Sequence, residues 1–137
     1  MQIRPATASD EVAIVALWRA CGLVVSYNDP NQDFRFALDG PSSSVLVCVT
    51  PDGAIAGSVM VGHDGHRGWV YYLSADPALR RQGIGKALMN AAEEWLKARG
   101  VPKLQLMVRE TNTSVLGFYQ RIGYETNPVK LVQKWLR

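Results

Sequence analysis

Hydrophobic and polar positions in the first part of the chain follow a helical period. After a short apolar stretch that predicts a strand around Ile3, the segment TASD (7–10) has the form of a capping box and precedes apolar residues at helical spacing. The segment NDP (28–30) predicts the start of a second, shorter helix with Pro30 at its first position. The first helix is expected to end at Gly22 and the second in the stretch GPSS.

The pattern then changes to runs that are rich in β-branched and aromatic residues. Three such runs are VLVCV (45–49), IAGSVMV (55–61) and WVYYLSA (69–75). The segments PDG (51–53) and HDGHRG (63–68) separate them and are typical of turns. The three runs are therefore predicted to form an antiparallel meander.

The rest of the chain alternates between the two periods. A long helix is expected to run to about Arg99, with four apolar residues on one face: Ile84, Leu88, Ala92 and Trp95. A strand at 104–108, a helix at 112–123 and a last strand at 130–136 follow. The predicted fold is a single domain (1–137) of the α/β (α+β) class, with a mixed, mostly antiparallel sheet flanked by helices in the order β-α-α-β-β-β-α-β-α-β.

Composition narrows the function classes only a little. The formal net charge of +3 is too small to predict a clustered basic face for nucleic acid. No apolar run reaches the length of about 20 residues that crosses a bilayer, and the N-terminus lacks the apolar region of a signal peptide. Cys21 and Cys48 have no metal-type partner, so we expect free thiols, no metal site and a cytoplasmic protein.

The stretch RRQGIGKAL (80–88) places two glycines where the long helix begins, although glycine is a poor helix former. Free N–H groups and the macrodipole make a helix N-terminus favourable for an anion, and Gly83 and Gly85 have no Cβ atom to hold an anion away. The basic side chains of the stretch add positive charge. A glycine pair also suits a tight turn between strand and helix, so both interpretations stay open here. The stretch matches neither the Walker loop nor the Rossmann fingerprint, which disfavours ATP and NAD.

The same region resembles the acetyl-CoA-binding signature of the GNAT superfamily of N-acetyltransferases. In that signature, [Q/R]-x-x-G-x-[G/A], the three defined positions are filled by Arg80, Gly83 and Gly85. Downstream, NTSVLGFYQRIGYE (112–125) resembles the second motif of the family, an asparagine followed by a helix ending in F-Y-x-[K/R]-x-G-[F/Y]. The order of elements is similar over essentially the whole chain.

Two shorter stretches, YNDP (27–30) and GHDGHRGWVYYL (62–73), are similar to small stand-alone bacterial acetyltransferases of the YpeA type. The family transfers an acetyl group directly from acetyl-CoA to an amine, without a covalent enzyme intermediate. The resemblance therefore implies an acetyl-CoA-dependent N-acetyltransferase that acts on a small molecule or a protein. From the charge and the apolar runs we expect no nucleic-acid or membrane partner, and a homodimer is a candidate because the family often forms dimers.

The resemblance also implies where the cofactor would lie. In the family, loop amides hold the pyrophosphate, and the pantetheine arm pairs with the preceding strand as an added strand would. The neighbouring strand must splay away to free that edge, and a bulge helps to open the gap. The expected cofactor contacts are Leu73, Ser74, Ala75, Arg80, Arg81, Gln82, Gly83, Ile84, Gly85, Lys86 and Asn112.

The resemblance points to Tyr119 as the residue that protonates or hydrogen-bonds the leaving sulfur, and the alternative is a core aromatic residue whose hydroxyl reaches solvent. Asn112 also fits a plain helix N-cap. Many relatives use a glutamate on the strand before the loop as the base, but WVYYL contains no carboxylate. Glu110 is a candidate base, and an amine deprotonated in solution needs none.

The acceptor side is less defined by the sequence. In relatives the segment between the first two helices lines it, which here indicates Tyr27, Asn28 and Asp29. Asp29 would suit a cationic amine, yet NDP is also a good cap for the second helix. The absence of a strand carboxylate leaves an alternative function open, a coenzyme A-binding sensor or interaction module with little transferase activity.

The remaining polar and aromatic candidates are given structural roles. Asp64, His63 and His66 are expected to be solvated in a turn, and Trp18 and Trp69 to be packing residues.

Overall fold

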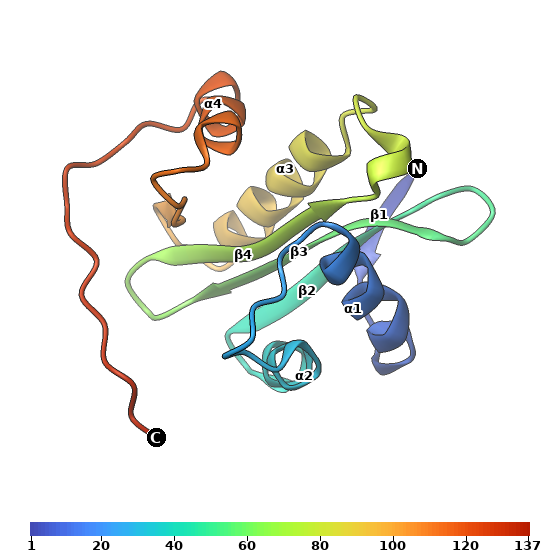
Figure 1. Cartoon of the computed structure of the whole chain (residues 1–137), viewed down its shortest axis with the longest axis horizontal. Coiled ribbons are helices and arrows are strands. Elements are labelled where there is room, and N and C mark those ends of the chain that lie inside the picture. Colours follow the sequence, from blue (N-terminus) through green and yellow to red (C-terminus); the bar gives the residue numbers. More distant parts are fainter. The chain divides into compact units, whose positions relative to one another are not determined.

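Residues 1–137 are described by the computed structural model, and they divide into two units, Met1–Leu106 and Met107–Arg137. The first unit contains a five-stranded sheet with helices on both faces, as Figure 1 shows. Its strands are β1 (Gln2–Pro5), β2 (Ser43–Val49), β3 (Ile55–His63), β4 (Gly68–Ala75) and β5 (Leu104–Gln105). Its helices are α1 (Glu11–Ala20), α2 (Pro30–Asp39) and α3 (Ile84–Lys97), with short 3-10 turns η1 (Ala8–Asp10) and η2 (Pro77–Leu79). The second unit contains α4 (Thr113–Arg121).

The strands follow one another across the sheet in chain order. The pairs from β1 to β4 are antiparallel, while β5 pairs with β4 in parallel. The predicted mixed, mostly antiparallel sheet flanked by helices is therefore confirmed.

The helix starts that the sequence predicted are formed by local side chains. Asp29 Oδ1 accepts hydrogen bonds from the backbone N–H groups of Asn31 (3.0 Å) and Gln32 (3.3 Å), and Pro30 occupies the first turn of α2. At the start of the first helical region, Asp10 Oδ2 accepts from the backbone N–H of Thr7 at 2.8 Å. These bonds satisfy N–H groups that have no partner within the helix.

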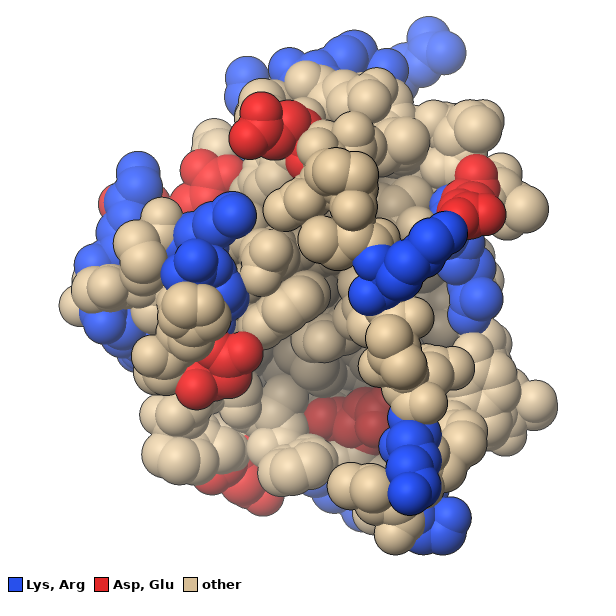
Figure 2. All heavy atoms as spheres, turned by 90° about the vertical axis from the view of Figure 1, so that its left-hand side faces the viewer, with Lys and Arg blue, Asp and Glu red and all other residues tan.

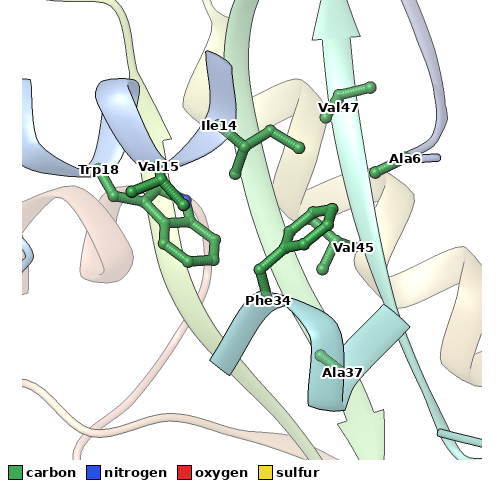
Figure 3. Packing of buried hydrophobic residues seen from close by; sticks show 8 residues of the cluster. All are labelled: Ala6, Ile14, Val15, Trp18, Phe34, Ala37, Val45 and Val47. Atoms are coloured by element: carbon green, nitrogen blue, oxygen red, sulfur yellow. The ribbon is translucent and has the colours of Figure 1, made fainter. Parts of the chain in front are cut away.

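The apolar stripes of α1 and α2 meet on one face of the sheet. Figure 3 shows the side chains of this cluster converging from both helices, from β2 and from the residue after β1: Ala6, Ile14, Val15, Trp18, Phe34, Ala37, Val45 and Val47. The opposite face packs against α3, because a Cβ on Gly57 would approach the side chain of Ile84 to 2.6 Å. Glycine at this strand position lets helix and sheet come close.

Three details of the sequence prediction are wrong. The strand expected at 104–108 has only two residues, since its pairing with β4 ends at Trp69. No strand forms at 130–136, where every side chain is exposed and the second unit offers no other strand as a partner. Alternation of apolar and polar residues stabilises a strand only through pairing and burial. On α3, Leu96 is buried rather than Trp95, which is half-buried under the Arg99 guanidinium.

Candidate functional site

A β-bulge interrupts the pairing of β3 with β4. Ser58 pairs with Ser74 and Met60 with Tyr71, so Tyr72 and Leu73 together lie opposite the single residue Val59. Tyr72 has a φ of 54°, in the left-handed region that residues other than glycine seldom adopt. The bulge bends β4 at this point.

The edge of β4 beyond the bulge has no strand beside it. β5 pairs only with Gly68 and Trp69, at the beginning of β4. Further along, Asp76 donates its N–H to the carbonyl of Ala56, so the N–H and C=O of Ala75 point away from β3, toward the open edge. At this edge the Ala75 carbonyl accepts a hydrogen bond from Cys21 Sγ, and no strand pairs with it before the chain enters η2 and α3 (Figure 1).

The N-terminus of α3 differs from those of α2 and α4, because no side chain caps it. Its N-cap is Gly83, with a φ of 75°, and the first helical bond runs from Ala87 N–H to Gly83 C=O. The N–H groups of Ile84, Gly85 and Lys86 are consequently left without a helical partner. Such a terminus is suited to bind an anion.

Space and charge around this loop are compatible with a charged ligand. A Cβ placed on Gly83 would meet no atom within 4 Å. The side chains that precede and follow it are exposed: Arg80, Arg81, Gln82 and Lys86. The backbone of Arg81 is also left-handed, with a φ of 64°. The loop therefore combines an open surface with positive charge.

A buried chain of hydrogen bonds lies beneath the bulge. Trp18 Nε1 donates to Ser58 Oγ at 2.9 Å, and Ser58 Oγ bonds Ser74 Oγ at 2.9 Å. Cys21 Sγ donates to the Ala75 carbonyl at 3.2 Å, and burial raises the pKa of this thiol. The hydroxyl of Ser74 thus already has a buried hydrogen-bond partner. Cys21 is a thiol rather than a thiolate.

Sequence reasoning missed a contact between α2 and the bulge. Tyr72 Oη donates to Asp33 Oδ2 at 2.6 Å, and the Tyr72 ring stacks on Trp18 with centroids 3.9 Å apart. Burial and the neighbouring carboxylate raise the pKa of Tyr72 well above its ordinary value. The sequence carried no signal for this pair because its members are 39 positions apart.

The predicted acceptor residues Tyr27, Asn28 and Asp29 precede α2, and Asp29 has a structural role at its start. Asp29 caps α2 as described, which supports the cap interpretation of NDP. Tyr27 is 54% exposed and Asn28 is half-buried. At the distal hairpin turn, Asp64 accepts from the backbone N–H groups of His66 and Arg67.

The second unit contains the remaining candidates. Asn112 Oδ1 accepts from the backbone N–H of Val115 at 3.4 Å, so it caps α4. Tyr119 is 7% exposed and packs edge-on against Phe118 and Tyr124; burial raises its pKa to about 12. Glu110 is exposed.

No group of histidine, cysteine, aspartate and glutamate side chains is arranged to hold a metal ion. None of the helices combines the length and the apolar character that a membrane crossing requires.

Comparisons with known proteins agree with each other. The model of the acetyltransferase (GNAT) family matches residues 12–124. A protein of Yersinia enterocolitica named an acetyltransferase is 43% identical over 136 residues, which cover 99% of this chain and 96% of the relative. Another, from Pectobacterium atrosepticum, is 44% identical over 126 residues, covering 92% of this chain and 89% of the relative.

A solved structure shares the fold. It is that of AAC(6')-Iy in complex with the bisubstrate analogue CoA-S-monomethyl-acetylneamine, with a TM-score of 0.83 and 17% identity over 98% of this chain and 97% of that one.

Proposed function

Because the chain belongs to the acetyltransferase (GNAT) family, we propose that it transfers an acetyl group from acetyl-CoA directly to a primary amine of a small molecule or protein. The observation that carries the proposal is the open edge of β4, which leads into the uncapped N-terminus of α3. An extended arm and a diphosphate need these two features in this order.

The pyrophosphate of coenzyme A would be held by the free N–H groups at the start of α3. Arg80, Arg81 and Lys86 would add charge-assisted contacts around it. The pantetheine arm would pair with the open edge at Leu73 and Ala75. Since the side chain of Ser74 is buried, we expect its contribution to be the position of the strand rather than a direct contact.

The transfer forms a bond between the amine nitrogen and the carbonyl carbon and breaks the bond between that carbon and sulfur. Tyr119 is the proposed acid that protonates the departing thiolate, because it fills the tyrosine position of the second family motif. Burial raises its pKa to about 12, so it carries its proton at neutral pH. Asn112 is a proposed contact of the pantetheine arm. Glu110 is the proposed acceptor of the amine proton, and water is the alternative.

We propose that both units belong to one catalytic domain, since the family match extends from residue 12 to residue 124 and crosses their boundary. Neither cysteine is assigned a catalytic role: burial raises the pKa of Cys21 and of Cys48. Both are free thiols, which supports a proposed location in the reducing cytoplasm.

Calorimetric titration with acetyl-CoA tests the cofactor site. We expect micromolar binding at about one site per chain, and much weaker binding of acetyl-pantetheine, which lacks the diphosphate. Equal affinity for the two ligands would contradict the role of the α3 terminus, and absence of binding by the folded protein would overturn the proposal. Release of free thiol from acetyl-CoA over a panel of amines then separates an active enzyme from a module that only binds coenzyme A.

A further inference from the structure

Asp33 is a carboxylate without a cationic partner on the face of the sheet that carries α1 and α2. It is half-buried and takes part in no salt bridge of the chain. The nearby Arg35 does not neutralise it, because Nε and Nη2 of Arg35 donate to the two carboxylate oxygens of Glu11, at 2.9 and 2.8 Å. A charge that is partly withdrawn from water is stabilised by a cation, and here a ligand would have to supply it.

The partner of Asp33 in the structure is the bulge of β4. Tyr72 donates its hydroxyl hydrogen to Oδ2, and the left-handed backbone of Tyr72 costs about 1 kcal/mol or more. The ring stacks on Trp18 with an interplanar angle of 10°, and Trp18 itself is anchored to Ser58. The hydroxyl is thus held toward Asp33 Oδ2 by packing.

Asp33 and the proposed phosphate site lie on opposite faces of the sheet. Gly57 faces α3, whereas its neighbour Ser58 faces Trp18 of α1, as the alternation of a strand requires. Figure 1 shows α3 on one side and α1 and α2 on the other. A pantetheine arm that starts at α3 and passes the open edge of β4 would therefore present its thioester on the side of Asp33.

We propose that Asp33, positioned by Tyr72, is the anion that binds the ammonium group of the acceptor before transfer. The inference rests on the proposed acetyl-CoA function and defines its acceptor side. Oδ1 accepts a charge-assisted hydrogen bond from the ammonium, while Oδ2 keeps the bond from Tyr72. The site therefore selects amines that arrive positively charged, and it supplies from α2 a carboxylate that β4 lacks.

A purely structural role for Asp33 is the competing explanation. An acidic residue in the first turn of a helix stabilises the helix by a few tenths of a kcal/mol, and Asp33 is such a residue in α2. That role affects stability, but it does not affect the choice between a charged and an uncharged ligand.

The test uses two coenzyme A thioethers that differ only in one terminal group. S-aminoethyl coenzyme A carries an ammonium where the acceptor nitrogen would approach, and S-propyl coenzyme A carries a methyl group in its place. Their dissociation constants are measured by calorimetry on the wild-type protein, on Asp33→Asn and on Asp39→Asn. Asparagine at position 33 keeps an acceptor for Tyr72, and Asp39→Asn removes the same charge from the exposed end of α2.

We expect wild type and Asp39→Asn to bind the ammonium probe about tenfold more tightly than the propyl probe, and Asp33→Asn to bind both equally. Unmodified coenzyme A should bind all three proteins alike. Equal binding of the two probes by wild type, or a preference that survives in Asp33→Asn, overturns the role of Asp33 while leaving the cofactor site intact. Failure of wild type to bind coenzyme A at all overturns the cofactor site and, with it, this inference.

Discussion

Trp18, Ser58 and Ser74 join α1 to β3 and β4 through hydrogen bonds that are sealed from water. All three side chains are almost completely buried, with exposed fractions of 0%, 0% and 3%. Each polar group has its partner in the next residue of the chain of bonds. Such a buried network stabilises the packing of α1 on β3 and β4 as long as every polar group in it has a hydrogen-bond partner.

Removing the central member tests this network. Ser58→Ala leaves the indole N–H of Trp18 without an acceptor, so the free energy of unfolding should fall by about 1–3 kcal/mol. Urea unfolding followed by tryptophan fluorescence measures the change. Ser44→Ala, at a half-buried position of β2, is the control and should change the free energy much less. Equal effects of the two substitutions would show that the hydrogen bonds contribute little.

A second prediction at the scale of a single residue concerns catalysis by Tyr119. Tyr119→Phe keeps the packing against Phe118 and Tyr124 but removes the hydroxyl that we propose as the proton donor to the thiolate. We expect kcat to fall roughly ten- to a thousandfold, with little change in acetyl-CoA affinity. Thiol release with an amine acceptor and calorimetry measure the two quantities. Tyr124→Phe is the matched control. An unchanged kcat in Tyr119→Phe would show that Tyr119 contributes packing and not catalysis.

The starts of α2, α3 and α4 differ in how their free N–H groups are satisfied. In α2 and α4 an Asp29 or Asn112 side chain accepts from the first turn, whereas α3 begins at Gly83 without such a bond. The free N–H groups of α3 lie at the end of β4, where the sheet edge is also open. The N-terminus of α3 thus leaves free the N–H groups that the proposed function needs for the diphosphate.

Gly85 gives the cleaner substitution for this site. A side chain at Gly83 would strain its left-handed backbone, whereas Gly85 is helical. Gly85→Glu should leave the fold intact, since a carboxylate in the first turn favours the helix, but it should weaken acetyl-CoA binding about tenfold or more by repelling the diphosphate. Gly85→Ala is the control for the added Cβ. Calorimetry with equal affinities for both variants would contradict an anion site here.

The start of the first helical region predicts a dependence of stability on pH. The Arg4 guanidinium, bonded to Asp10 at 2.8 Å, lowers the pKa of that carboxyl from 3.8 to about 2. A lowered folded-state pKa adds stability that is fully present above the unfolded pKa and is lost as the pH falls from about 4 to about 2.

Asp10→Asn should therefore lower the free energy of unfolding at neutral pH by about 0.5–1 kcal/mol, because the pair is partly exposed, and by less near pH 2. Denaturation at several pH values measures the difference. Asp39→Asn serves as the control without such a partner bond. A difference that stays constant over this pH range would argue against the ion pair as its source.

On the scale of the whole molecule, the charges are mixed in sign. The chain carries 15 basic and 12 acidic residues, and Figure 2 shows basic and acidic side chains on the same face with uncharged residues between them. Nucleic-acid binding depends on a clustered basic face that displaces counterions. The loop before α3 and the first turn of α3 contribute three exposed basic side chains, those of Arg80, Arg81 and Lys86.

The protein should therefore not retain a DNA duplex at an ionic strength of about 0.15 M. Electrophoretic mobility of labelled duplex with increasing protein measures retention. Retardation at micromolar protein that disappears as salt is raised would reveal an electrostatic surface and contradict this prediction.

Much of the fold could be predicted from local sequence because caps, turns and hydrophobic periods act over a few residues. Asp29 and Asn112 cap helices where the pattern expected them, and the loop around Gly83 begins α3 as predicted. These features involve neighbours in the chain, so their physical causes are contained in short segments.

What the tertiary structure decided depends on segments far apart in the chain. The bulge at Tyr72, its bond to Asp33 and the open edge beyond Trp69 follow from which strands pair and where pairing stops. The same reason explains why the alternating run 130–136 is not a strand, since alternation alone supplies no hydrogen-bond partner. The sequence by itself determined the elements and the cofactor-loop signature; only the packing of α1 and α2 on β4 brought a carboxylate to the side where an acceptor would bind.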